Sequence, residues 1–112
     1  MDQTVAIVTP AFKAEATLAT TMRSVLDQTW PHWQVWLVAD DGTNYETLLA
    51  ASGIRDTRIR FLSSGGIGRG ASTARNVALE QITAPYIAIL DADDRLKPQK
   101  LERAVSALAT HA

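Results

Sequence analysis

Three aspartates crowd into four residues, at Asp91, Asp93 and Asp94, directly after the apolar run at residues 86–90. Close pairs of like charges repel by about 1 kcal/mol in water, and by more where water is partly excluded. The cluster therefore needs a compensating cation, and we expect Mg2+ or Mn2+ that in turn holds a diphosphate. The alternative interpretation is that Asp94 caps the next helix, while Asp91 and Asp93 are solvated turn residues.

Strands and helices alternate along the chain in a way that would position this cluster. Four apolar, β-branched runs begin near Thr4, Gln34, Arg58 and Tyr86, and each precedes a segment with helical spacing. Apolar stripes mark the first, third and fourth helices at Leu18, Met22, Val25 and Leu26, at Val77, Ala78 and Ile82, and at Leu101, Ala104, Val105 and Leu108. A short second helix is expected at about residues 45–51. Such units predict an α/β fold with a parallel sheet and right-handed crossovers.

Helix start signals accompany these units. Thr43 and Glu46 are spaced as a capping box for the second helix, and Ser72 or Thr73 is placed to cap the third. Pro98 suits a first helical position in the fourth. The local sequence therefore predicts where each helix begins.

The character of each strand predicts the order of the sheet. The third strand alternates charge with apolar residues, and Arg58 and Arg60 suit an edge that is guarded against further pairing. The first, second and fourth strands are apolar on both faces, as a covered parallel sheet requires. We therefore expect strand order 3-2-1-4 in a Rossmann-like three-layer sandwich. Ligands of such sheets bind where the first and fourth strands part, and there the loops T-P-A-F-K-A-E, D-D-G-T and D-A-D-D should meet.

Five motifs carry a resemblance to a known family. They are V-T-P-A-F-K-A-E-A-T-L, S-V-L-D-Q-T-W-P-H-W, L-V-A-D-D-G-T, G-A-S-T-A-R-N-V-A-L and Y-I-A-I-L-D-A-D-D-R-L-K-P. In this order they resemble the family 2 glycosyltransferases of the GT-A fold. The resemblance covers nearly the whole chain and implies that residues 1–112 are a single domain, the amino-terminal, nucleotide-sugar-binding half of a truncated GT-A fold. The acceptor-binding part is expected to be absent.

The resemblance implies a nucleoside site after the first strand. Thr9, Pro10 and Phe12 match the loop that holds the nucleoside, with Phe12 where the family usually has a tyrosine near the base. A phenyl ring stacks on a base with about 1–3 kcal/mol. Lys13 stands where an asparagine is common, and Glu15 matches the family's acidic position. A glutamate that interacts with the helix dipole is the alternative for Glu15.

The resemblance also implies roles on the other loops. Asp41 matches the carboxylate that accepts from N3–H of uracil, a donor that cytidine lacks; an Asp-Gly turn is the alternative. Arg75 matches an arginine that meets phosphate or sugar oxygens. Asp91 is implied to lie near the ribose and donor sugar, and Asp93 to bind the metal as the D-x-D carboxylate.

The expected function is therefore transfer from a nucleotide-diphospho-sugar, with UDP as the favoured nucleotide, to an acceptor hydroxyl with inversion at the anomeric carbon. The general base is expected outside this chain, so the isolated chain should transfer no sugar. The alternative is a non-catalytic nucleotide-binding or scaffold module. The acceptor, whether a sugar, a lipid-linked molecule or another hydroxyl, is not identified by the sequence.

A rival motif lies before the third helix. Gly66, Gly68 and Ala71 satisfy G-x-G-x-x-A, and Asp91 falls twenty residues after Ala71, which is dinucleotide-binding spacing. That fingerprint normally occupies the first βα unit, whereas this one occupies the third. It also leaves D-D-G-T and D-A-D-D unexplained.

Composition limits the partners. The 112 residues carry 11 basic and 12 acidic side chains and no cysteine, so no electrostatic grip on nucleic acid and no thiolate metal site is expected. No apolar run approaches the roughly 18 residues of a membrane span, and no signal peptide is recognisable. We expect a cytoplasmic chain, with any membrane association through segments outside it. The exposed edge of the fourth strand should favour a homo-oligomer.

Overall fold

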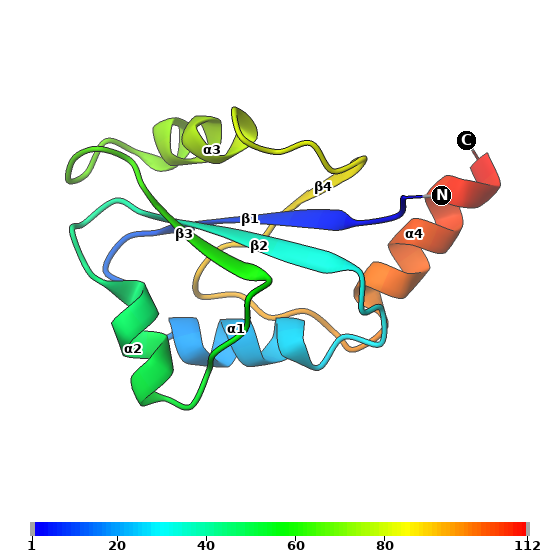
Figure 1. The fold of residues 1–112 in the computed structure, drawn as a ribbon, viewed down its shortest axis with the longest axis horizontal. Helices are drawn as coiled ribbons and strands as arrows, with labels where there is room; N and C mark the ends of the chain where they lie inside the picture. The colour runs from blue at the N-terminus through cyan, green and yellow to red at the C-terminus, as the bar shows by residue number, and fades with distance from the viewer. Residues whose placement is uncertain (1, 112) are drawn as a thin grey trace.

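The computed structural model describes residues 2–111, which form the four predicted βα units (Figure 1). Their elements are β1 (Val5–Ala11), α1 (Leu18–Leu26), β2 (Trp33–Ala39), α2 (Tyr45–Ala51), β3 (Ile59–Ser63), α3 (Ala71–Leu79), β4 (Tyr86–Ile89) and α4 (Lys100–His111). None of the helices in this part of the chain combines the length and the apolar character that crossing a membrane requires.

The sheet confirms the predicted topology. Its strand order is β3-β2-β1-β4 and every neighbouring pair is parallel. β1 pairs with β2 along all seven of its residues, from Val5 to Ala11, but with β4 only from Val5 to Val8. The last residues of β1 therefore extend beyond the β4 ladder, at the point where the chain switches direction across the sheet.

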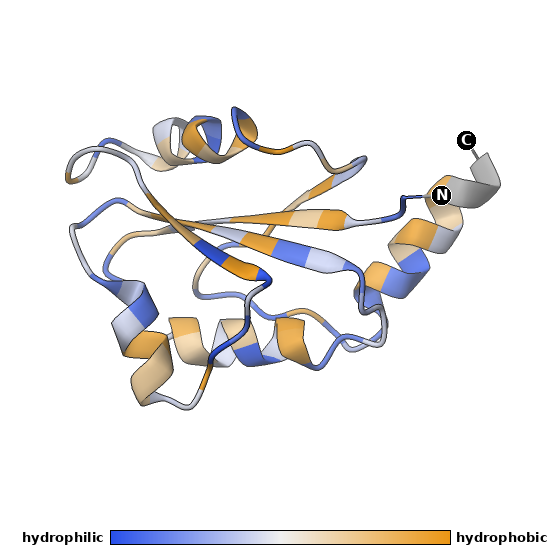
Figure 2. Cartoon of the chain, in the orientation of Figure 1, coloured by the Kyte–Doolittle hydropathy of each residue, from blue (hydrophilic) through white to orange (hydrophobic). Residues whose placement is uncertain are grey.

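Two apolar clusters make the three layers. On one face Ile7 and Leu37 pack with Leu18 and Met22 of α1, and α2 and α4 add residues to the same cluster. On the other face the strands pack against Ala74 and Ala78 of α3, with Val77 and the following Ile82 and Ala84 at the margin of the cluster. Figure 2 shows hydrophobic residues running along β1 between these layers. The three-layer prediction is confirmed, with the two faces covered unequally.

One face of β4 is partly exposed to solvent, because the helices cover the two faces of the sheet unequally. Ile87 and Ile89 pair in register with Ala6 and Val8, so they share the face that α3 covers. Ala6 and Val8 are fully buried, whereas Ile87 and Ile89 are 50% and 49% exposed. The expectation that β4 is covered on both faces is therefore wrong for this face, because α3 does not extend over the edge strand.

The predicted bounds of α2 are confirmed, but the predicted capping residues of α2 and α3 are wrong. α2 begins at Tyr45, and its cap is Asn44, whose Oδ1 accepts from the amide of Thr47 at 3.0 Å. The predicted capping box of Thr43 and Glu46 is therefore displaced by one residue. α3 begins at Ala71, and its N-cap residue is Gly70, which has no side chain to cap the helix. Ser72 and Thr73 therefore lie inside the helix and do not cap it. Pro98 lies in the turn before α4.

Candidate functional site

The carboxyl ends of the parallel strands gather the predicted loops at one edge of the sheet, toward the left of Figure 1. Hydrogen bonds join these loops to one another. The loop after β2 contacts both the loop after β1 and the loop that leads into α3, and the loop after β4 contacts α1. The loops after β1 and β2 therefore meet as predicted, and the loop after β4 lies beside the loop after β1.

Asp40 ties β2 to the loop before α3. It is only 4% exposed, and its carboxylate accepts from the Ser64 hydroxyl at 2.6 Å and from the amides of Arg69 and Gly70 at 3.0 Å each. The hydrogen bond from Ser64, with those from the two amides, outweighs desolvation and holds the pKa of Asp40 below its usual 3.8. Asp40 thus fixes the backbone of the two residues that immediately precede α3.

The G-x-G-x-x-A motif before α3 is bonded to Asp40. Gly68 has φ +67°, and its amide donates to the Asp40 carbonyl oxygen at 2.8 Å. The next two amides donate to the Asp40 carboxylate. These amides therefore serve the protein itself and are not free to cradle a pyrophosphate, which argues against the dinucleotide interpretation.

Asp41 ties β2 to the loop after β1. Its Oδ2 accepts from the Lys13 amide at 2.7 Å and from the Tyr45 hydroxyl at 2.5 Å, and its Oδ1 accepts from the Thr43 amide at 3.0 Å. Desolvation raises the pKa of Asp41, but these hydrogen bonds outweigh it and hold the pKa below 3.8. A carboxylate offers about four acceptor positions, so one remains beyond the three that are used.

Lys13 adopts the left-handed conformation, with φ +53°, and it is the one residue other than glycine to do so among residues 2–111. This conformation costs a side-chain-bearing residue about 1–2 kcal/mol. Its neighbour Phe12 is 48% exposed, and the Lys13 ammonium lies 5.4 Å from the centre of the Phe12 ring. The strained loop therefore presents an aromatic face to solvent.

The other predicted residues of this loop lie at different depths. Thr9 is fully buried in β1, and its hydroxyl has no hydrogen-bond partner within the described residues. Pro10 is half-buried. Glu15 is exposed and precedes α1, and its Oε1 accepts from the Thr43 hydroxyl at 3.2 Å. Glu15 thus adds a second link between the loops after β1 and β2.

The D-A-D-D loop is held by its backbone. The Ala92 carbonyl accepts from the hydroxyls of Thr17 and Thr21 at 2.9 Å each, and the Asp94 amide donates to the Asp91 carbonyl at 3.0 Å. The side chains of Asp91, Asp93 and Asp94 are exposed. α1 therefore fixes the loop without occupying the carboxylates of Asp91 and Asp93.

One hollow brings two of the predicted loops together. It has a volume of about 310 Å³ and is lined by Phe12, Lys13, Ala14, Thr17, Ala92 and Asp93. We call it the Phe12–Asp93 hollow. Among the side chains that the structure describes, those of residues 2–108, no three or more of His, Cys, Asp or Glu converge as a metal-binding group. A cation here would need oxygen ligands from its own bound partner besides Asp93, as Mg2+ commonly takes from phosphates.

Arg75 lies apart from this hollow on α3. It is half-buried, and within the described part of the chain its Nε is a buried donor without a hydrogen-bond partner. Leaving such a group unpaired costs about 1–3 kcal/mol. Arg75 Nε is therefore a buried donor for which the described residues supply no acceptor.

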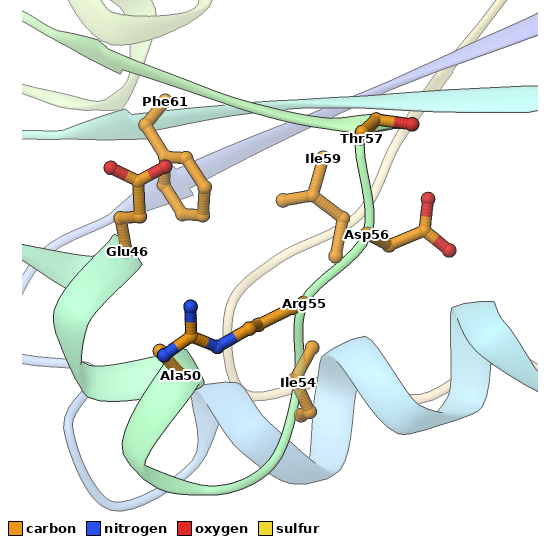
Figure 3. A pocket seen from close by; sticks show the side chains of 8 residues that line it. All are labelled: Glu46, Ala50, Ile54, Arg55, Asp56, Thr57, Ile59 and Phe61. Carbon is orange, nitrogen blue, oxygen red and sulfur yellow. The ribbon is translucent and has the colours of Figure 1, made fainter.

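A further hollow of about 450 Å³ lies between α2 and β3 (Figure 3). Ile54, Ile59 and Phe61 form apolar walls, and the charged side chains of Glu46 and Arg55 reach over it. None of the predicted site residues lines it, so it does not belong to the site at the carboxyl edge.

Sequence reasoning missed three residues that organise the site. They are Thr17 and Thr21, which hold Ala92, and Tyr45, which is 2% exposed and bonds to Asp41. The two threonines are four residues apart on one helical face, a spacing that could have drawn attention to them.

Comparison with known proteins identifies the relatives of this chain. The family described as Glycosyl transferase family 2 matches residues 6–112. A curated relative from Escherichia coli, named UDP-Glc:alpha-D-GlcNAc-diphosphoundecaprenol beta-1,3-glucosyltransferase WfgD, is 37% identical over 105 residues, which are 94% of this chain and 41% of that protein. The chain therefore spans about two fifths of that relative's length.

Two solved structures share the fold. S. aureus TarS 1–349, solved in complex with UDP-GlcNAc, has a TM-score of 0.85 and 20% identity, over 96% of this chain and 32% of that one. The mannosyltransferase PcManGT from Pyrobaculum calidifontis, in complex with GDP-Man and Mn2+, has a TM-score of 0.75 and 20% identity, over 93% of this chain and 31% of that one. These likenesses confirm the predicted GT-A-like fold.

The Asp40 contacts predict a pH dependence of stability. Because the pKa of Asp40 is lower in the folded protein than the usual 3.8, ionised Asp40 stabilises the fold above that pH, and this contribution is lost as the pH falls through the folded value. Asp40→Asn should therefore be less stable than wild type at about pH 7, and the gap should narrow by about pH 3.

Urea unfolding of both proteins at the two pH values measures the gap. Asp27→Asn, at an exposed position after α1, is the control and should change stability little at either pH. A gap for Asp40→Asn that stays the same at both pH values would contradict the role given to this carboxylate.

Proposed function

The chain belongs to glycosyl transferase family 2, and from this premise we propose that its 112 residues form the donor-binding domain of a glycosyltransferase that uses a nucleotide-diphospho-sugar, with UDP as the nucleotide. The observation that carries this proposal is the Phe12–Asp93 hollow, which joins an exposed aromatic ring to an exposed carboxylate. The aromatic ring suits the base at one end of a nucleotide-diphospho-sugar. The carboxylate suits a metal ion that is bound to the diphosphate.

The nucleoside end would be formed by the loop after β1 and by Asp41. Phe12 offers a face for the base, since stacking of a base on an aromatic ring contributes about 1–3 kcal/mol. The acceptor position left on Asp41 suits N3–H of uracil, which supports UDP over a cytidine nucleotide. Thr9 and Pro10 of β1 would form the floor of this site. Glu15 would hold the loop after β1 against Thr43.

The diphosphate end would be formed by the D-A-D-D loop. Asp93 suits Mg2+ or Mn2+ because it is an exposed hard oxygen ligand beside the hollow, and such ions take one or two carboxylates with phosphate oxygens and waters. When bound, the ion would neutralise negative charge on the departing diphosphate. Asp91 would face the ribose and donor sugar, and the guanidinium of Arg75 would donate to a phosphate or sugar oxygen.

Transfer itself would be a single inverting displacement. An acceptor hydroxyl attacks the anomeric carbon, the bond from that carbon to the diphosphate breaks, and the hydroxyl proton passes to a general base. Every carboxylate in the proposed site already has a role in binding the nucleotide-sugar or the metal ion. None of these residues is therefore assigned as the general base. The name of the E. coli relative includes a lipid-linked diphosphate acceptor, and a cytoplasmic chain with membrane association outside these residues is compatible with such an acceptor.

UDP binding tests the proposed site. Calorimetric titration with Mn2+ should show binding that is lost with a chelator and weakened at least about tenfold by Asp93→Ala, because both changes remove the link to the diphosphate. The control is Asp94→Ala, whose side chain accepts from the Arg95 amide and should alter affinity little. Equal affinity with and without the chelator would contradict the metal-held diphosphate.

Sugar transfer tests the missing base. We expect the 112-residue chain with UDP-sugar, Mn2+ and a simple hydroxyl acceptor to form no product above the Asp93→Ala background, because no residue is assigned to take the proton. Chromatographic detection of glycosylated acceptor measures this. Product formed by the chain alone would show that the general base lies within it.

If a longer protein that contains these residues also binds UDP without transfer, the alternative of a non-catalytic nucleotide-binding module gains support.

Self-association tests the proposed role of the β4 edge. The unpaired ladder of β4 and the half-exposed Ile87 and Ile89 favour pairing with a second copy. Light scattering at tens of micromolar should therefore give a mass above that of the monomer, and Ile89→Lys should restore the monomer mass. The control is Ile67→Lys in the loop before α3, where the side chain is 74% exposed. A monomer mass for wild type would contradict the proposal.

A further inference from the structure

Tyr45 connects two elements of the site without reaching its surface. Its side chain is 2% exposed at the start of α2, and its hydroxyl has two partners. The hydroxyl donates to Asp41 Oδ2 at 2.5 Å and accepts from the Ala14 amide at 3.1 Å. The same Asp41 oxygen accepts from the Lys13 amide at 2.7 Å. One phenol and one carboxylate therefore hold two consecutive amides of the loop after β1.

These two amides flank the strained point of the loop. Lys13 has the left-handed backbone conformation, which persists only where surrounding contacts compensate for its cost. The hydrogen bonds from Lys13 to Asp41 and from Ala14 to Tyr45 are such contacts. Phe12 immediately precedes this point, so the direction of its ring depends on the conformation that the contacts stabilise.

The carboxylate is oriented by the same contacts. Tyr45 and Lys13 both donate to Oδ2 of Asp41, and the Thr43 amide donates to Oδ1. With three donors around it, the carboxylate cannot rotate freely, and its remaining acceptor position has a fixed direction. Phe12 and Asp41, the two groups that would meet the base, are therefore set by one network.

We propose that Tyr45 is a positioning residue for the nucleobase, which acts through the Asp41 carboxylate and the backbone of the loop after β1. The inference rests on the proposed function, since it concerns the same donor site, and it adds a residue that contacts no ligand. The Tyr45 hydroxyl bonds to Asp41 and to Ala14, and Tyr45 does not line the hollow that contains Asp93. We therefore expect its effect on binding of the base to exceed its effect on binding of the diphosphate.

The proton in this network stays on the phenol near neutral pH. Burial and the hydrogen bond to Asp41 raise the pKa of Tyr45 to about 12, whereas the pKa of Asp41 is lowered. The hydroxyl therefore donates to an ionised carboxylate, which is a stronger hydrogen bond than one between neutral groups.

Tyr45→Phe tests the inference because it removes the hydroxyl and keeps the ring in the core. Calorimetric titrations with Mn2+ use two ligands, UDP and inorganic pyrophosphate. We expect the affinity for UDP to fall about tenfold, as two hydrogen bonds that set the base site are lost, and the affinity for pyrophosphate to change less than about twofold. A purely structural role would not separate the two ligands.

Asn44→Ala is the matched control. It removes the cap of the same helix, where Asn44 accepts from the Thr47 amide, without removing a contact to Asp41 or to the loop after β1. UDP affinity should stay within about twofold of wild type. Amide hydrogen exchange in the unliganded proteins should show faster exchange at Lys13 and Ala14 in Tyr45→Phe than in wild type or Asn44→Ala.

The outcomes separate the inference from the function on which it rests. If wild type binds UDP and Tyr45→Phe binds it equally well, or if Asn44→Ala loses as much affinity, the inference is overturned and the proposed function stands. A folded wild-type chain that binds no UDP would overturn the proposed function and, with it, the inference.

Discussion

The site depends on two adjacent carboxylates at the end of β2. Successive side chains of a strand point to opposite faces of the sheet, so Asp40 faces the α3 side and Asp41 faces the side of α1 and α2. Asp40 accepts from the loop that leads into α3, and Asp41 accepts from the loop after β1 and from Tyr45. A single dipeptide thereby fixes loops in both outer layers to the strand that lies between them.

The two acidic motifs, D-D-G-T and D-A-D-D, differ in how many hydrogen bonds their carboxylates accept. The carboxylates of Asp40 and Asp41 are each surrounded by three hydrogen-bond donors, which offsets the cost of removing them from water. The loop of Asp91 and Asp93 is instead fastened through the Ala92 carbonyl, and its two carboxylates remain in solvent. The first motif builds the edge of the sheet, and the second leaves ligand atoms accessible there.

Periodicity predicted the fold because strands and helices are encoded locally. Continuous apolar runs marked three strands, alternation marked the third, and apolar stripes marked three of the helices. The charged third strand indicated the edge, so the strand order followed. Contacts between distant segments were not predicted in the same way. The backbone before α3 is held by Asp40, thirty residues before Gly70, and the partners of Ala92 are Thr17 and Thr21. The spacing of the two threonines is a local signal, but Tyr45 carries none, because its role depends wholly on contacts with distant segments.

The alternation along β2 also bears on how accurately the strand must pair. A shift of its register by one residue would turn every side chain to the opposite face. Such an error would turn Asp40 and Asp41 away from the loops that donate to them. Because β2 carries apolar residues on both faces, its core positions alone distinguish the two registers poorly. The two aspartates that arrange the site therefore also help to select the correct register of the strand before them.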